Sequence, residues 1–203
     1  PLESGEVLLA RAKQSLRFPS EVLLVGATNP CPCGWWGDPR QGCSCGQHRR
    51  QQYWSRISGP LLDRFDLQVP LRSQQPDQSS PRAPEATRVV ARRVELARER
   101  MQQRNPQGCC NARLTAAELQ SCVRFSSDAE IWWRDLQPEP PLSGRSRDRL
   151  LAVALSLADL AASPLLEPQH LAEALLFRSL ERSVVRDGGL DPALSRGARI
   201  AGD

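Results

Sequence analysis

Residues 56–69 read Arg-Ile-Ser-Gly-Pro-Leu-Leu-Asp-Arg-Phe-Asp-Leu-Gln-Val, and this stretch decides the fold that the sequence predicts. Its last four residues, 66–69, form a short strand-like run, and a second such run, Val-Leu-Leu-Val, occupies residues 22–25. Short apolar runs bounded by turn formers are typical of buried parallel strands. We therefore predict an α/β unit over residues 1–72.

Polar residues flank both predicted strands. Asn29 follows the first strand, at the carboxyl edge where open α/β sheets bind ligands, and its amide can hold a water molecule. Asn29-Pro30 is also a common turn pairing, so a plain turn is the alternative. Arg64 precedes the second strand, and Asp63 and Asp66 can pair with it on the surface.

Two Cys-x-Cys pairs lie nine residues apart in a Gly-rich stretch that we call the cysteine loop, residues 31–45. Their thiolates can bind a tetrahedral Zn²⁺, and His48 can replace one of them. Four free thiols, or a redox disulfide, are the alternatives. The predicted metal ligands are Cys31, Cys33, Cys43 and Cys45.

The other sulfur and aromatic residues carry simpler predictions. Trp35 and Trp36 are expected to pack over the cysteine loop rather than to stack on nucleobases. The three remaining cysteines show no ligand spacing and are expected to be ordinary thiols; they are Cys109, Cys110 and Cys122.

Basic residues alternate with apolar ones near the start of the chain, and residues 7–16 are expected to form a hairpin projecting from the sheet. Arg11, Lys13 and Arg17 are spaced by two and four residues, so on one strand they would share a face. A shared basic face suits tracking of a DNA backbone. A solvated strand edge protected by charge is the alternative.

The composition changes after residue 72. Residues 73–84 are rich in Gln, Ser and Pro, as expected of a linker. Residues 85–183 show helical periodicity and predict an all-helical second domain. Its predicted apolar faces comprise Val89, Val90, Val94 and Ala97; Leu150, Ala154, Leu157, Ala158 and Ala161; and, on a helix spanning residues 167–180 with Pro168 in its first turn, Leu171, Ala174, Leu175 and Phe177. Residues 184–203 are expected to be a flexible tail.

Bulk properties narrow the class of protein. The chain has 203 residues, of which 40% are hydrophobic, and a formal net charge of +4. This mildly basic balance is compatible with polyanion binding but does not establish it. Seven cysteines, four of them grouped between positions 31 and 45, with no signal segment and no long apolar run, predict a cytoplasmic protein without a membrane span. A start at Pro1 rather than Met predicts a fragment.

Two motifs resemble one family closely. Residues 27–34, Ala-Thr-Asn-Pro-Cys-Pro-Cys-Gly, and residues 56–67 resemble the magnesium-chelatase-like AAA+ ATPases of the ComM/YifB branch. Residues 1–7 are similar to the segment after the family's Walker B strand, and residues 142–145 with 150–160 are similar to its lid helix. The departures are Trp35-Trp36 in place of tyrosines, and Gly144 in place of alanine.

The resemblance implies roles for three residues. By similarity, Asn29 is the sensor 1 residue that orients the attacking water, and Arg64 is the arginine finger that reaches a neighbouring subunit's nucleotide. Arg145 corresponds to the sensor 2 arginine at the start of the lid helix, although Arg147 and Arg149 lie close enough to compete for that role. Basic residues at a helix start oppose the helix dipole, so three of them suggest an external anion.

The resemblance also implies a function for the complete protein: an ATP- and Mg²⁺-dependent hexameric motor that acts on DNA, as in branch migration. No Gly-x-x-x-x-Gly-Lys-Ser/Thr motif occurs in the chain, so we expect the phosphate-binding loop to lie upstream and the fragment alone to be inactive. Two alternatives are a non-enzymatic, zinc-stabilised nucleic-acid-binding or scaffold module and a magnesium-chelatase motor subunit. The cysteine loop, by resemblance, argues against the second.

Overall fold

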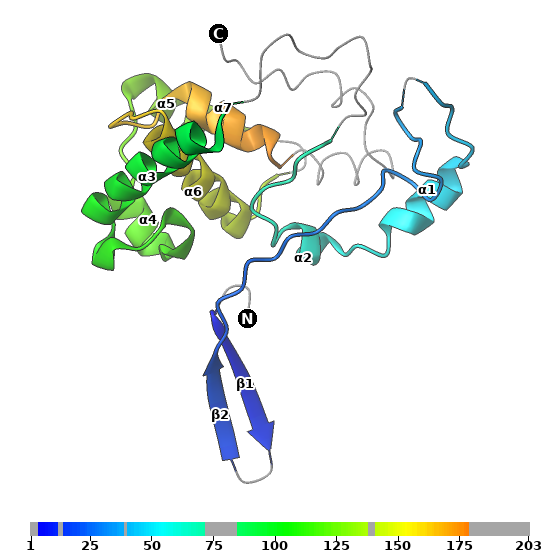
Figure 1. The fold of residues 1–203 in the computed structure, drawn as a ribbon, viewed down its shortest axis with the longest axis horizontal. Helices are drawn as coiled ribbons and strands as arrows, with labels where there is room; N and C mark the ends of the chain where they lie inside the picture. The colour runs from blue at the N-terminus through cyan, green and yellow to red at the C-terminus, as the bar shows by residue number, and fades with distance from the viewer. Residues whose placement is uncertain (1–3, 12–13, 39, 72–84, 138–140, 179–203) are drawn as a thin grey trace.

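The computed structural model describes residues 4–11, 14–38, 40–71, 85–137 and 141–178. Within these ranges it contains one antiparallel hairpin and seven α-helices (Figure 1). The elements are β1 (Glu6–Arg11), β2 (Gln14–Pro19), α1 (Gln47–Trp54), α2 (Gly59–Leu62), α3 (Thr87–Arg104), α4 (Ala116–Cys122), α5 (Ser127–Asp135), α6 (Gly144–Leu160) and α7 (Pro168–Leu176), with short 3-10 turns η2 (Pro106–Gly108) and η3 (Asn111–Arg113). The predicted linker and tail lie outside the described residues.

The described residues between 85 and 178 are helical, as the sequence predicts, and α6 is the centre of this unit. Helix α6 packs against α3, α4 and α7, and α7 packs against α5. The predicted apolar face of α6 holds at Leu150, Ala154 and Ala158, which are buried. Leu157 is half-buried, whereas Ala161 follows the last residue of the helix and is exposed. The hydrophobic core comprises Leu119, Ala129, Leu150, Leu151, Ala154, Leu155, Ala158, Leu166, Leu171 and Ala174.

Helix α3 departs from the predicted apolar face. Ala97 is buried, but Val89 and Val94 are 47% and 42% exposed. The reason is that α3 faces α6 partly with arginines: Arg100 donates a hydrogen bond to the Asp159 carbonyl at 2.9 Å, and Arg104 also binds Asp159. Val89 and Val94 lie at the margins of this polar packing face and stay in contact with solvent.

A buried polar network joins α3, η3 and α6. Arg104 donates from both terminal nitrogens to the Asp159 carboxylate, at 2.6 and 2.8 Å. Asn111 donates to the same carboxylate at 2.9 Å and to Ser156 Oγ at 3.0 Å, and it accepts from Arg104 and Asn105. Because a buried charge is tolerated only when it is paired and hydrogen-bonded, this network fixes the approach of α3 to α6.

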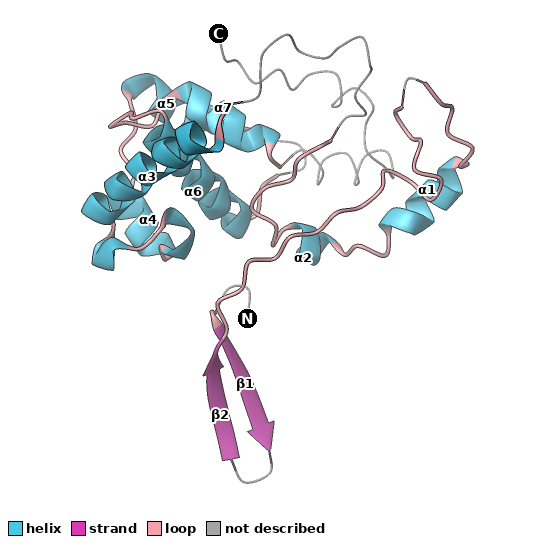
Figure 2. Ribbon diagram, in the orientation of Figure 1, coloured by secondary structure: helices cyan, strands magenta, loops and turns pink. Residues whose placement is uncertain are grey.

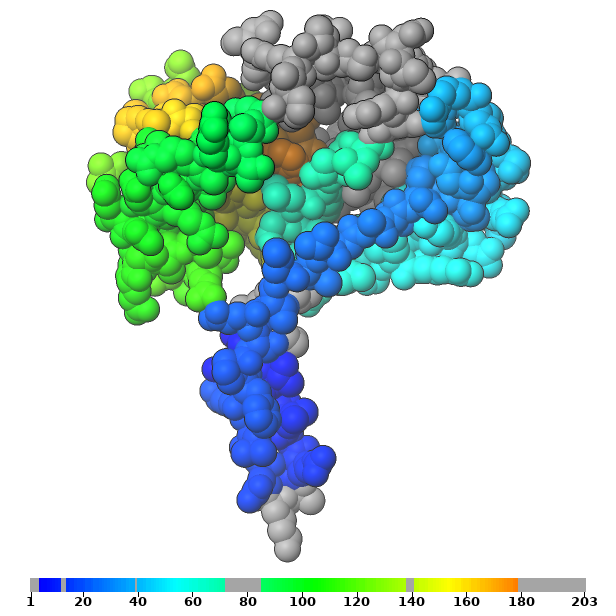
Figure 3. Space-filling view, viewed as in Figure 1, coloured from blue at the N-terminus to red at the C-terminus, as the bar shows by residue number. Residues whose placement is uncertain are grey.

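The predicted hairpin is confirmed, and it extends from residue 6 to residue 19. Its register places Leu9 opposite Leu16 and Val7 opposite Phe18. Figure 2 shows β1 and β2 as the two strands of the described chain, and in the space-filling view they stand clear of the remainder (Figure 3). The hairpin therefore projects from a largely helical body rather than from a sheet.

The two predicted parallel strands are not strands in the structure. Residues 22–25 are extended, and their four apolar side chains are between 48% and 92% exposed. Within residues 66–69 the Gln68 amide donates to the Phe177 carbonyl beyond the end of α7, at 2.8 Å, and Leu67 and Val69 are exposed. An apolar run forms a buried strand only when neighbouring strands pair with it, and among the described residues none does.

None of the described helices combines the length and the apolar character that crossing a lipid bilayer requires.

Candidate functional site

The four predicted metal ligands converge in the structure. The sulfur atoms of Cys31, Cys33, Cys43 and Cys45 all lie within 4.8 Å of one another. Cys31 Sγ is 3.3 Å from Cys33 Sγ, and Cys43 Sγ is 3.6 Å from both. A tetrahedral site with Zn–S bonds of about 2.3 Å places its sulfurs about 3.8 Å apart, so these residues fit a zinc ion.

Local structure explains why the cysteine loop closes. Gly34 has a positive φ of 85°, and its amide donates to the Cys31 carbonyl at 3.0 Å, which makes the tight turn after the first pair. The buried Trp54 of α1 donates from Nε1 to the Pro30 carbonyl at 3.0 Å. Helix α1, which the sequence analysis did not single out, thus anchors the start of the loop.

Arg50 of α1 covers the other side of the loop. Its guanidinium lies 3.6 Å from the centre of the Trp36 ring and donates to the Cys45 carbonyl. Trp36 therefore packs in the loop as predicted, whereas Trp35 is 37% exposed. His48 lies on the exposed surface of α1 and is not among the grouped ligands.

The thiols differ in acidity. A hydrogen bond from the Trp35 backbone is the main reason that the pKa of Cys33 falls to about 5. Burial raises the pKa of Cys43 to about 11 and also raises the pKa of Cys45. Because like charges at these separations repel, four thiolates require a cation between them.

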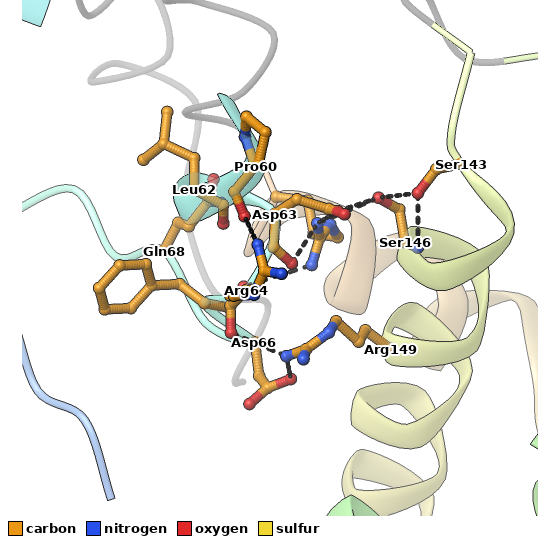
Figure 4. A network of polar contacts seen from close by, with 11 residues as sticks. Pro60, Leu62, Asp63, Arg64, Asp66, Gln68, Ser143, Ser146 and Arg149 are labelled. Carbon is orange, nitrogen blue, oxygen red and sulfur yellow. Dashed lines mark hydrogen bonds and ion pairs between the residues drawn. The ribbon is translucent and has the colours of Figure 1, made fainter. Parts of the chain in front are cut away.

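A second cluster joins the segment 59–68 to the helical unit, and we call it the junction (Figure 4). The Asp63 carboxylate accepts from Arg178 Nη2 at 2.8 Å and from the Ser146 hydroxyl. Arg178 is 1% exposed and also donates to the Phe65 carbonyl at 3.3 Å. Ser143 caps α6 by accepting from the Ser146 amide at 3.0 Å. The junction therefore fixes the segment against the start of α6 and the end of α7.

The sequence missed this arrangement. A surface pairing of Asp63 and Asp66 with Arg64 was the alternative interpretation of these residues, and the structure shows ion pairs of Asp63 with Arg178 and of Asp66 with Arg149. The residues in these contacts lie 83 and 115 positions apart in the chain, so no local sequence pattern indicates the contacts.

Two of the predicted nucleotide-sensing residues adjoin the junction. Arg64 follows Asp63 and donates from Nη1 to the Pro60 carbonyl at 2.8 Å. Arg145 precedes Ser146 and is exposed in the first turn of α6. The Asp63–Ser146 hydrogen bond thus brings together the two backbone segments that carry these arginines.

The inference from three basic residues at the start of α6 needs correction. Arg147 lies over the Trp133 ring at 4.4 Å, and Arg149 donates to the Arg64 carbonyl at 2.8 Å as well as pairing with Asp66. Arg147 and Arg149 therefore have partners within the chain, and the presence of basic residues at this helix start does not call for an external anion.

Asn29 lies next to the cysteine loop and is exposed. The preceding Thr28 hydroxyl is within hydrogen-bond distance of the Tyr53 hydroxyl, at 2.9 Å, which links this segment to α1. A Cβ atom at Gly26 would lie 3.5 Å from the Phe65 ring, so the Asn29 segment passes beside the residue that follows Arg64.

The basic residues of the hairpin do not share a face. Arg11 lies opposite Gln14 and Arg17 lies opposite Leu8, and residues directly opposite in an antiparallel pair point to the same side. Because residues 8 and 11 point to opposite sides of β1, Arg11 and Arg17 do so too. The reason is that the two arginines belong to different strands, so their relative orientation depends on the pairing register and not on their spacing in the sequence. Lys13 lies outside the described residues.

Two family models match the chain. Residues 1–79 match the family described as magnesium chelatase, subunit ChlI, and residues 84–178 match magnesium chelatase, subunit ChlI C-terminal. No Gly-x-x-x-x-Gly-Lys-Ser/Thr motif falls in either matched region.

Relatives extend this similarity. The chain is 36% identical over 188 residues to the uncharacterized protein YifB of Salmonella typhimurium and 41% identical over 180 residues to an uncharacterized protein of Mycobacterium tuberculosis. It is 35% identical over 184 residues to competence protein ComM of Haemophilus influenzae. These matches cover 91%, 88% and 90% of the chain but 36%, 35% and 35% of the relatives. The chain therefore spans about a third of the length of these relatives.

The junction predicts the effect of replacing Arg178 with alanine. Asp63 and the Ser146 hydroxyl would lose the guanidinium that donates to them. Removing one partner of a buried ion pair lowers the free energy of unfolding by about 3–5 kcal/mol. We expect the Gln68 amide, which donates to Phe177, to exchange hydrogen faster in Arg178→Ala, as measured by hydrogen-exchange mass spectrometry or NMR. Arg134→Ala, which removes an exposed ion pair with Asp135, is the control. Unchanged exchange at Gln68 in the Arg178 variant would contradict the anchoring role.

Proposed function

The chain belongs to the magnesium-chelatase family, and on that premise we propose that it forms part of an ATP-driven, ring-forming AAA+ ATPase. The observation that carries the proposal is the junction, which holds the segment bearing Arg64 against the start of the helix bearing Arg145. Guanidinium groups suit phosphate oxygens because they stay charged and present a planar set of donors. The junction holds together the two segments from which these groups extend, so each group would be presented to a nucleotide from a fixed position.

In this proposal Arg64 acts on the nucleotide of an adjacent copy. Its contact with the Pro60 carbonyl restrains the side chain at the end of α2. An arginine supplied in this way neutralises charge that develops on the transferred phosphoryl group, and it accelerates hydrolysis by about 10³ to 10⁵. The Asp63–Arg178 ion pair is a positioning element, because it fixes the backbone from which Arg64 extends.

Arg145 and Asn29 act on the nucleotide of their own copy. Arg145 would contact phosphate oxygens from the first turn of α6, where the helix dipole also favours an anion. Asn29 would hold the attacking water through its side-chain amide. ATP supplies the transferable phosphoryl group and Mg²⁺ neutralises its oxygens, but the 203 residues contain no phosphate-binding loop, so these side chains complete a nucleotide site rather than form one.

The cysteine cluster binds Zn²⁺ in a structural role. A closed Cys₄ site stabilises a fold and leaves no open coordination position for catalysis. Two of the four ligands are buried, and α1 covers the loop through Trp54 and Arg50. The metal would therefore fix the loop that follows Asn29 and restrict the position of that side chain.

DNA is the proposed substrate of the motor, and the hairpin is its proposed contact. One of the matched relatives is named a competence protein. Arg11 and Arg17 point to opposite sides of the projecting hairpin, so the hairpin would present cations on both of its faces rather than on one. This arrangement suits contact with a phosphate backbone independently of sequence. The proposed assembly is a homo-oligomer, a hexamer by family resemblance.

The function is tested by Arg64→Ala in the full-length polypeptide. ATP turnover is expected to fall by about 10³ or more, because the charge stabilisation of the transition state is lost. Mixing this variant with a second variant that lacks the lysine of the phosphate-binding loop should restore part of the activity. Restoration is expected because mixed rings contain some interfaces with an intact loop on one copy and Arg64 on the other.

Arg98→Ala is the matched control for this experiment, since Arg98 is an exposed arginine on α3 that belongs neither to the junction nor to the lining of the groove between α3 and α6. Unchanged turnover in Arg64→Ala would overturn the proposed role. A full-length protein that hydrolyses no ATP would instead leave the zinc-stabilised nucleic-acid-binding module as the function to pursue.

The metal is tested by elemental analysis of protein purified under reducing conditions. We expect equimolar zinc, its loss in Cys43→Ser, and its retention in Cys122→Ser, which alters a thiol outside the cluster. Removal of the metal by a chelator should also expose the loop to proteolysis. Substoichiometric zinc in the gently purified parent protein would contradict the assignment.

The DNA contact is tested by the salt dependence of binding. In the full-length protein, replacing Arg11, Lys13 and Arg17 with glutamine should lower the slope of log K against log salt by up to about 2.7, because each phosphate contact contributes about 0.9. Arg134→Gln serves as the control. An unchanged slope in the triple variant would exclude the hairpin as the DNA contact.

A further inference from the structure

The groove between α3 and α6 is a surface that the nucleotide and DNA proposals leave unexplained. It has a volume of about 510 Å³, and its lining includes four apolar residues that we call its floor, namely Val89, Leu96, Leu160 and Ala162. Val89 and Leu160 are 47% and 40% exposed. Apolar side chains that line an open groove favour insertion of another apolar group.

Four arginines complete the lining, which contains no acidic residue. They are Arg88, Arg92, Arg93 and Arg100. Arg92 and Arg93 form ion pairs with Glu95, Glu99 and Glu85, in which every side chain is 49% or more exposed. Such exposed pairs are worth little and can be exchanged for others. The groove therefore fits an acidic segment that carries an apolar side chain at its centre.

Helix α5 of this same chain has that character. Its exposed face carries Ile131, which is 50% exposed, with Asp128, Glu130 and Asp135 around it. Arg134 pairs with Asp135 at 3.1 Å, which leaves an acidic excess on this face. The opposite side of α5 is occupied, because Ala129 is buried in the core and Trp133 packs against it.

The groove and the α5 face are different surfaces of one chain. Helix α3 packs on α6, α6 on α7, and α7 on α5, so α3 and α5 are the two ends of this packing order. A contact between two different surfaces of identical copies is heterologous, and it generates a ring when the rotation closes.

From these observations we propose that the α3–α6 groove binds helix α5 of an adjacent copy of the chain, with Ile131 on the apolar floor and the α5 carboxylates against the arginines. The proposal rests on the ring-forming function proposed above and assigns a second contact to it. A single helix against a groove buries less than the roughly 800 Å² per partner of a stable interface, so this contact supplements the interface at Arg64.

The test places a photo-crosslinking amino acid at position 131 of the full-length protein. Isotope-labelled and unlabelled copies are mixed and irradiated, and the products are mapped by mass spectrometry. We expect crosslinks between labelled and unlabelled chains at residues 88–96 or 160–162. The same amino acid at position 120, an exposed position on α4, is the control and should give no such product.

A charge exchange completes the test. Arg88→Glu should abolish the crosslink by repelling the α5 carboxylates, and addition of Asp128→Arg should restore it. Crosslinks within one chain, crosslinks to another protein, or no crosslink at all would overturn the proposal. The outcome is separable from the proposed function. If ATP turnover is restored on mixing Arg64→Ala with the phosphate-binding-loop variant but this crosslink is absent, the ring is retained and the α5 contact is removed.

Discussion

The ion pair between Asp63 and the buried Arg178 is the interaction on which the proposed nucleotide chemistry depends. It is the point where the segment 59–68, which has little core of its own, is attached to the helical unit. Arg178 is 1% exposed, and its terminal nitrogens donate to Asp63, Ser146 and the Phe65 carbonyl, so loss of Asp63 would leave a buried cation without its carboxylate. Asp63 precedes Arg64 in the chain, so the pairing of Asp63 with the buried Arg178 also fixes the position of Arg64.

The helical unit uses the same physical device a second time. Asp159 is buried and accepts hydrogen bonds from Arg104 and Asn111, which joins α3 to α6 where apolar packing is incomplete. Because this contact is made by polar side chains, Val89 and Val94 remain exposed at the margin of α3. The exposed apolar floor of the α3–α6 groove and the buried ionic network are thus two consequences of one packing choice.

The cysteine loop is organised differently, because its contacts are local. The four sulfurs lie within fifteen consecutive residues, and a glycine turn with one helix is enough to bring them together. This is why residue spacing alone predicted their convergence. The exposed apolar run at residues 22–25 shows the opposite case: its composition predicts a strand, but no described residue pairs with it.

What the sequence determined by itself was local or repeated: the helical periodicity of α6 and α7, the hairpin, the convergence of four cysteines and the family motifs. Each depends on residues a few positions apart, whose geometry follows from backbone periodicity. Only the tertiary structure decided that Asp63 pairs with Arg178, 115 positions away, that Arg147 and Arg149 have partners within the chain, and that Arg11 and Arg17 point to opposite sides. Such pairings depend on strand register and on which surfaces pack together, and neither is encoded in the spacing of the residues involved.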